Sequence, residues 1–270
     1  GDGCLMEGLS HEACSLAGHL KLNKLIMFFD DNSISIDGST ELSTSDDIKK
    51  RFQSYNWNYL KIDGHSFEEI NNAIFEAKKS LYPTIIACKT TIGYGSPNKS
   101  GKASSHGSPL GEDEIELVRK ELNWDYKAFE IPNDLLKSWR NFHNRNIKIR
   151  DSWIKTNSEI IKSKKFNNYF NNNINNELKK DIIKFKNNHF EEKTICATRK
   201  ASELSLNLIS NHLPNLIGGS ADLTGSNNTK TKEMKILKAD DFSGSYLHYG
   251  IREHGMAGIM NGIALHGGLR

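Results

Sequence analysis

The chain has 270 residues, of which 37% are hydrophobic and 26% are charged, a composition typical of soluble globular proteins. No apolar run approaches the roughly 20 residues that a membrane-spanning helix needs, so we expect no membrane partner. The formal net charge of +3 is small for this length and gives no reason to expect a nucleic acid as a partner.

The cysteines and the chain ends give two further expectations. The four cysteines lie far apart and form no CxxC pair, which argues against a zinc site or a disulfide framework. Scattered free thiols suit a reducing compartment, so we predict a cytoplasmic protein. The chain starts at Gly1 without a Met and stops directly after a helical pattern. We therefore expect an internal piece of a longer enzyme, and we expect this piece alone to be inactive.

The first section of the chain, residues 1–130, alternates helix and strand patterns. Apolar spacing predicts helices over 9–20, 66–80 and 112–122, and apolar runs predict strands over 24–30, 57–62 and 84–88. Ser66 with Glu69 three residues later matches a capping box. A loop rich in Gly, Ser and Lys spans 93–109. This alternation predicts an α/β fold, with a parallel sheet covered by helices.

The remaining sections are a connector and a second α/β region. Residues 131–193 are rich in Lys and Asn, yet apolar residues recur there every three or four positions, which predicts one amphipathic helix through Phe166, Phe170, Ile174, Leu178, Ile182 and Phe185. From residue 194 onward we predict a helix over 198–210 capped by Thr198, strands over 215–219 and 246–249, and a helix over 253–266. The predicted organisation is therefore two partial domains, 1–130 and 194–270, joined by a helical connector, 131–193.

Two polar segments in the first section suggest a metal site. Asp2 stands just before the first predicted helix, and Asn32 closes the next strand thirty positions later. Carboxyl ends of neighbouring parallel strands lie side by side and commonly bind phosphates, so these two residues can meet across one ion. Mg²⁺ favours such oxygen ligands. Each segment alone is more often a turn or a solvated loop.

Two other phosphate-binding motifs fail in this sequence. Met6 stands where the dinucleotide fingerprint needs its third glycine. In the lysine-containing loop, Ala103 stands where a P-loop needs a Ser or Thr directly after the lysine.

The joined pattern is more specific. GDGCLMEGLSHEA followed by DDNSISIDG resembles the thiamine diphosphate motif of transketolases. Four further segments resemble the same family, so that the likeness covers almost the whole chain: KTTIGYGSPNKSGKASSHGSPLGEDEI, ATRKASE, GGSADLTGSN and YLHYGIREHGMAGIMNGIALHGG. The resemblance implies a thiamine diphosphate-binding fold. It also implies Mg²⁺, or Ca²⁺ or Mn²⁺ in its place, as the metal.

The resemblance also implies roles for particular residues of the first section. Asp2, Asn32 and the carbonyl of Ile34 match the family's metal ligands. Gly3 matches the position that approaches the diphosphate, and Glu7 matches an acidic residue near the cofactor. His106 matches a cofactor-contacting histidine with a catalytic role, although a histidine in a Gly/Ser loop is otherwise an ordinary solvent-facing residue.

The second section carries the other implied roles. Glu253 matches the catalytic glutamate that bonds the aminopyrimidine ring of the cofactor, although an acid in a first helical turn is otherwise unremarkable. Asp222 matches an aspartate of the cofactor region. Arg199 and Ser226 match residues that hold the phosphate of the sugar substrate, although alone they read as a surface arginine and a turn serine.

The implied activity is transfer of a two-carbon ketol unit from a ketose phosphate to an aldose phosphate, as in the pentose phosphate pathway. The family's cofactor site lies between subunits, so the expected partner is a second copy of the chain in a homodimer. Two alternatives stay open: another thiamine diphosphate enzyme, namely a formaldehyde-using transketolase or a deoxyxylulose phosphate synthase, and a non-catalytic scaffold of the same fold. The joint presence of Asp2, Asn32, His106 and Glu253 disfavours the scaffold.

Overall fold

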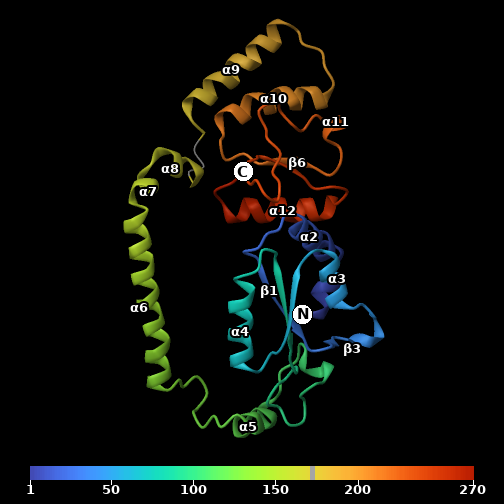
Figure 1. Ribbon diagram of the computed structural model, residues 1–270, viewed down its shortest axis with the longest axis vertical. Helices are drawn as coiled ribbons and strands as arrows, with labels where there is room; N and C mark the ends of the chain where they lie inside the picture. The colour runs from blue at the N-terminus through green and yellow to red at the C-terminus, as the bar shows by residue number, and fades with distance from the viewer. Residues whose placement is uncertain (171–173) are drawn as a thin grey trace. The chain divides into compact units, whose positions relative to one another are not determined.

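The computed structural model describes residues 1–170 and 174–270, which form two compact units, Gly1–Ser152 and Trp153–Arg270. Each unit contains parallel strands with helices beside them, so the predicted α/β class is confirmed for both (Figure 1). Within the described ranges, every helix is too short or too polar to traverse a bilayer.

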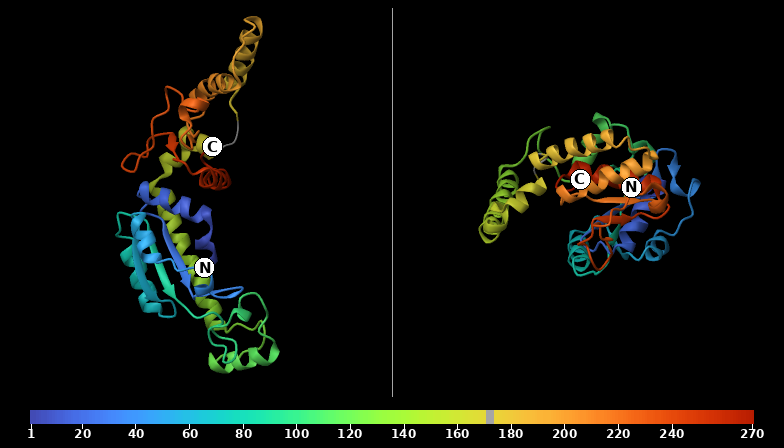
Figure 2. Two further views of the ribbon diagram at one scale, coloured as in Figure 1. Left: turned by 90° about the vertical axis from the view of Figure 1, so that its right-hand side faces the viewer. Right: turned by 90° about the horizontal axis from the view of Figure 1, so that it is seen from above.

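The core of the first unit is a three-stranded parallel sheet (Figure 2). Its spatial order is β1 (Ile26–Asp31), β5 (Thr84–Lys89) and β4 (Asn58–Asp63), so the strand that comes last in the chain lies in the middle. The register aligns Asp31 and Asp63 with the same central residue, Lys89. The carboxyl ends of all three strands are therefore level at one edge of the sheet.

Helices cover both faces of this sheet (Figure 1). The central strand β5 is buried from Thr84 to Cys88 and apolar from Ile85 to Cys88, as expected for a parallel strand enclosed on both sides. Its Ile85 and Ala87 pack in one buried cluster with residues of α1 (Asp2–Met6), α2 (Gly8–His19) and α3 (Ile48–Ser54). Its alternate residues Ile86 and Cys88 pack with Ala73 and Ala77 of α4 (Phe67–Ala77).

The tightest contact in the first cluster is made by a glycine. A Cβ on Gly18 of α2 would overlap the carbonyl oxygen of Tyr55, just beyond α3. Gly18→Ala is therefore expected to lower the free energy of unfolding by about 3 kcal/mol, the upper end of the usual cost of overpacking. Denaturant unfolding of the full-length protein measures this. Gly8→Ala in the same helix is the control, because a Cβ there meets nothing within 4 Å. Equal stability of the two variants would contradict the proposed close contact.

The other elements of the first unit connect these layers. Between β1 and α3 lie the hairpin of β2 (Ile34–Ser35) and β3 (Gly38–Ser39) and the short helix η1 (Thr40–Leu42). After β5 come η2 (Ala103–Ser105), α5 (Glu112–Glu121) and α6 (Asn133–Thr156), which runs across the division between the units.

The second unit has a two-stranded parallel sheet, β6 (Gly218–Ser220) with β7 (Tyr246–His248). Its helices are α7 (Ser158–Lys162), α8 (Lys164–Phe170), α9 (Asn176–Glu191), α10 (Thr198–His212), α11 (Thr224–Asn227) and α12 (Glu253–His266). Helices α9 and α10 are joined by a contact between His212 Nε2 and Asp181 Oδ2 at 2.9 Å.

Three sequence predictions of local structure are wrong. The single helix through Phe166 to Phe185 is two helices, because Ile174 is outside any helix and Asn175 caps α9 by accepting from the Leu178 N–H at 2.7 Å. The part of that predicted helix at residues 171–173 lies outside the described residues. Thr198 does not cap α10 but is its first residue, after Ala197.

The third wrong prediction concerns the extent of a strand, and the capping box predicted at Ser66 is only half formed. The strand predicted over 215–219 begins at Gly218, because the backbone of Asn215 and Ile217 pairs instead with Arg270. Ser66 does cap α4, accepting from the Glu69 N–H at 3.3 Å. The Glu69 carboxylate, however, accepts from the N–H of Asp63 at 2.8 Å rather than from Ser66.

Candidate functional site

The predicted metal ligands of the first unit lie on α1 and in the turn after β1. Asp2 is the first residue of α1. The side chain of Asn32 accepts from the Ile34 N–H at 2.9 Å through Oδ1 and donates to Asp30 Oδ2 at 3.3 Å through Nδ2. Ser33 between them has a φ of 62°, a left-handed conformation typical of a tight turn. The turn therefore places the Asn32 amide and the Ile34 backbone next to each other.

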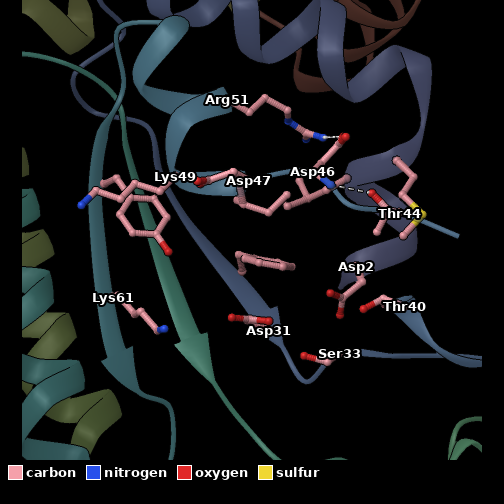
Figure 3. Close-up of a pocket in the computed structure, with 15 residues that line it drawn as sticks. Asp2, Asp31, Ser33, Thr40, Thr44, Asp46, Asp47, Lys49, Arg51 and Lys61 are labelled. Carbon is pink, nitrogen blue, oxygen red and sulfur yellow. Dashed lines mark hydrogen bonds and ion pairs between the residues drawn. The ribbon is translucent and has the colours of Figure 1, made fainter. Parts of the chain in front are cut away.

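A pocket of about 460 Å³ extends from this turn toward α3. Figure 3 shows Asp2, Asp31 and Ser33 at one end of it and Arg51, which pairs with Asp46 at 3.9 Å, at the other. The pocket thus brings α1 and the carboxyl end of β1 to the same space, although Asn32 and Ile34 are not among its lining residues.

The carboxyl group of Asp2 is perturbed by burial and by neighbouring acids. Its pKa is raised from the ordinary value, first by burial and then by the nearby carboxylate of Asp31, with a smaller contribution from Asp30. Its Oδ2 is buried and has no hydrogen-bond partner. A buried carboxylate oxygen without a partner is costly, and a divalent cation with oxygen ligands would offset that cost. The residues present therefore fit a hard metal ion.

Asp30 and Asp31, the two acids before Asn32, interact with residues at the end of β5. Lys89 Nζ donates to Ser33 Oγ at 2.8 Å and lies 3.7 Å from Asp31 Oδ1. The Thr90 hydroxyl donates to the carboxylate of Asp30. Sequence reasoning missed Lys89 and Thr90, because only the pairing of β1 with β5 brings them to this turn. Among the residues that the structure describes, no group of three or more His, Cys, Asp or Glu side chains is arranged for a metal. The predicted ligand set differs from such a group, because it consists of the Asp2 carboxylate, the Asn32 side-chain amide and the Ile34 backbone carbonyl.

Gly3 in α1 and Glu7 directly after α1, the two predicted cofactor contacts of this segment, are both exposed. A Cβ on Gly3 would meet no protein atom within 4 Å, so the space beside this backbone is open to an approaching group. Glu7 lies between α1 and α2, where its extended backbone interrupts the helix. Its carbonyl accepts a hydrogen bond from the N–H of Ser10 at 3.0 Å.

His106 lies in the loop between β5 and α5. It is exposed and directly follows η2, with its N–H donating to the Ala103 carbonyl at 2.9 Å. It is not among the residues that line the pocket beside Asp2. The structure thus places this histidine on a separate loop of the same unit.

The remaining predicted residues belong to the second unit. Asp222 and Ser226 are exposed in the segment after β6, and Glu253 is exposed as the first residue of α12, shortly after β7. Because β6 and β7 pair in parallel, with Ser220 opposite His248, these three residues follow neighbouring strand ends. Arg199 is exposed in the first turn of α10, apart from both strand ends in the sequence.

A buried tyrosine fixes the segment that carries Ser226. The Tyr246 side chain of β7 is completely buried. Its hydroxyl lies 2.8 Å from Thr224 Oγ1 and 2.7 Å from Thr229 Oγ1, on either side of Ser226. Sequence reasoning assigned Tyr246 only to a strand. A tyrosine in a strand carries no sign of which hydroxyls its oxygen will reach.

Comparison with protein families accounts for almost the whole chain. Residues 1–180 match the thiamine diphosphate binding domain of transketolase, and residues 195–270 match the pyrimidine binding domain of transketolase. The chain is 48% identical over 270 residues to the transketolase of Cereibacter sphaeroides, covering 100% of this chain and 41% of that protein. It is 48% identical over 276 residues to the transketolase of Buchnera aphidicola, covering 99% of this chain and 41% of that protein.

Solved structures agree with the sequence relatives. A crystal structure of a transketolase mutant from Pichia stipitis superposes with a TM-score of 0.86 at 37% identity, covering 99% of this chain and 41% of that one. The transketolase of Campylobacter jejuni gives a TM-score of 0.80 at 33% identity, covering 99% of this chain and 40% of that one. The predicted thiamine diphosphate-binding fold is thereby confirmed. The chain spans about 41% of the length of the sequence relatives that it matches, and it belongs to the transketolase family.

Proposed function

We propose that the protein containing this chain transfers a two-carbon ketol unit from a ketose phosphate to an aldose phosphate, using thiamine diphosphate and a divalent metal. The observation that carries this proposal is the partnerless, buried Oδ2 of Asp2 beside the Asn32–Ile34 turn, in a thiamine diphosphate-binding domain. Support for the substrate class comes from the relatives. A Pichia stipitis transketolase at 36% identity has been solved in complex with sedoheptulose-7-phosphate.

In this proposal the first unit holds the charged end of the cofactor. Asp2, the Asn32 amide oxygen and the Ile34 carbonyl bind the metal, which is Mg²⁺ or, in its place, Ca²⁺ or Mn²⁺. Gly3 lets the diphosphate approach the backbone, where its missing Cβ leaves the space open. Glu7 adds to the acidic surroundings of the cofactor.

The second unit and His106 handle protons and orientation. Bound thiamine diphosphate supplies carbanion chemistry at its thiazolium carbon, and the protein supplies orientation and proton handling. The Glu253 carboxylate holds a proton at the pyrimidine ring nitrogen, and Asp222 contributes to the same cofactor region. His106 donates a hydrogen bond to the cofactor and moves a proton at the reacting atoms.

The proposal extends to assembly and organisation. The metal-binding residues and Glu253 occur in different units, and in the family the two halves of one site come from two subunits, so we propose a cytoplasmic homodimer. The division into residues 1–130, 131–193 and 194–270, as two partial domains and a connector, belongs to the same proposal.

The test is a turnover assay of the full-length protein with a ketose phosphate donor and an aldose phosphate acceptor. Activity should require both thiamine diphosphate and a divalent metal and disappear on chelation. Formaldehyde as the preferred acceptor, or pyruvate as the preferred donor, would replace the proposal by one of the two enzymatic alternatives. Failure to bind thiamine diphosphate would favour the scaffold.

Arg199 and Ser226 are expected to bind the phosphate of the sugar. A guanidinium fork and a hydroxyl suit a phosphate monoester, and a hydrogen bond to a charged group contributes about 1.5–3 kcal/mol. Arg199→Ala should therefore lower kcat/KM for phosphorylated donors about tenfold to a hundredfold. The lower end is expected, because Arg199 is exposed to solvent. Ser226→Ala should cost less.

The control reaction for these two variants uses hydroxypyruvate and an unphosphorylated acceptor, which present no phosphate. That reaction should barely change in either variant. Equal damage to both reactions would mean that Arg199 supports the structure or the cofactor instead.

A further inference from the structure

The loop before α5 is tied down by one buried carboxylate. Glu114, in the first turn of α5, is only 7% exposed. Its Oε1 accepts from the Ser96 hydroxyl and from the Asn98 N–H at 2.9 Å, and its Oε2 accepts from Asn98 Nδ2 at 3.0 Å. A buried acid is rare unless it is paired or fully hydrogen-bonded, and here every partner comes from a single turn of the loop.

That turn is connected to both sides of His106 through Lys99. The Lys99 N–H donates to Ser96 Oγ at 3.1 Å, inside the turn that Glu114 holds. The Lys99 carbonyl accepts from the Ser105 hydroxyl at 2.6 Å, immediately before His106. Lys99 Nζ donates to the Leu110 carbonyl at 2.6 Å, four residues after His106. The segment that presents His106 is therefore held at both ends by one lysine, and the glutamate fixes that lysine's backbone.

The packing around these bonds leaves little freedom. Gly93, at the start of the loop, has a φ of +66°, a conformation that favours glycine. A Cβ there would meet Ser105 Oγ at 3.1 Å and the Lys99 carbonyl oxygen at 3.3 Å. The start of the loop thus lies beside the bond between Lys99 and Ser105, with little room for a side chain at Gly93.

We propose that Glu114 is a positioning residue for His106: it fixes the Ser96–Lys99 turn, and through Lys99 it sets the place of the histidine. This inference rests on the proposed function in one respect, namely that His106 contacts the cofactor. The ordering of the loop by Glu114 does not depend on that function.

The charge state of Glu114 agrees with this role. Hydrogen bonds from Ser96 and Asn98 lower its pKa to about 2, and the Lys99 ammonium acts in the same direction. Because the pKa in the folded state lies below the ordinary 4.5, the stabilisation of the loop is complete above 4.5 and is lost as the pH falls toward 2. At neutral pH the carboxylate is therefore always available as an acceptor.

A double-mutant cycle in the full-length holoenzyme tests the inference. Glu114→Gln keeps the shape of the side chain but removes its charge and turns one acceptor into a donor. We expect kcat to fall about tenfold or more, since misplacing a reacting group by about an ångström costs up to a hundredfold. In a His106→Ala background the same change should have less than a twofold effect, because Glu114 then has no histidine to place. An equal loss in both backgrounds, or no loss with intact His106, would overturn the proposal.

The matched control is Glu116→Gln on the same helix. The Glu116 side chain is 65% exposed and forms an ion pair with Arg119 at 3.9 Å, so this variant removes a charge from the same helix without removing a bond to the loop. Amide hydrogen exchange, which needs no activity, is the second measurement. Exchange at Asn98, Lys99 and His106 should quicken in Glu114→Gln and stay unchanged in Glu116→Gln. Unchanged exchange in both would refute the inference, whereas an inactive wild-type protein with the expected exchange would refute only the proposed function.

Discussion

Replacing Glu253 by alanine in the full-length protein is expected to lower turnover about 10²–10⁴-fold, the usual contribution of a positioned acid or base. Most of the affinity for thiamine diphosphate should remain, because the proposed diphosphate and metal contacts belong to the first unit. Glu253 is an exposed first-turn residue of α12, so its removal should leave the fold intact. Deuterium exchange at the thiazolium carbon should slow in parallel with turnover.

Glu177 offers a matched control for this experiment. Like Glu253, it is an exposed acid in the first turn of a helix, here α9, and it has no proposed role at the cofactor. Glu177→Ala should therefore retain full turnover. Fast deuterium exchange in a Glu253→Ala protein that no longer turns over would show that the carboxylate acts at a later step.

Replacing Asp2 by asparagine should weaken thiamine diphosphate binding by more than about a hundredfold at limiting Mg²⁺. Substituting a residue that only hydrogen-bonds to a metal ligand typically changes metal affinity about 10–100-fold. Loss of a direct ligand should therefore have at least as large an effect. Rising Mg²⁺ should restore part of the loss. The apoprotein should not lose stability, because the substitution removes a buried charge that has no hydrogen-bond partner at Oδ2.

Titration of the cofactor at several Mg²⁺ concentrations measures this effect. Asp46→Asn is the control, since Asp46 lines the same pocket but pairs with Arg51 and is outside the proposed ligand set. If both variants bind the cofactor equally well at limiting Mg²⁺, Asp2 is not a metal ligand.

The sequence predicted the sheet of the first unit well because its strands are marked by local composition. Within Thr84–Lys89, the four consecutive apolar residues from Ile85 to Cys88 predict a buried strand, and this part of the strand is buried. The connector was harder, because apolar spacing continues across the break between α8 and α9. The side chain of Asn175 caps α9, but in a segment rich in asparagine nothing in the local sequence distinguishes this residue from its neighbours.

The supporting residues of the site were not predictable in the same way. Lys89, Glu114 and Tyr246 each act through a partner that is brought close only by the tertiary fold. Glu114 looks like an ordinary first-turn acid, no different in sequence from Glu112 beside it. Its burial against the Ser96–Lys99 turn distinguishes it, and no pattern of residue types records that burial.

The shared hydroxyl of Tyr246 also constrains how related sequences diverge. A phenol has one proton, so Tyr246 donates to one of Thr224 and Thr229 and accepts from the other. A phenylalanine at this position would leave the part-buried hydroxyls of Thr224 and Thr229 without this partner at the same time, and a single later substitution would remove only one of them. We therefore expect positions 224, 229 and 246 to change together during evolution, so that homologues lacking the tyrosine hydroxyl also lack both threonines.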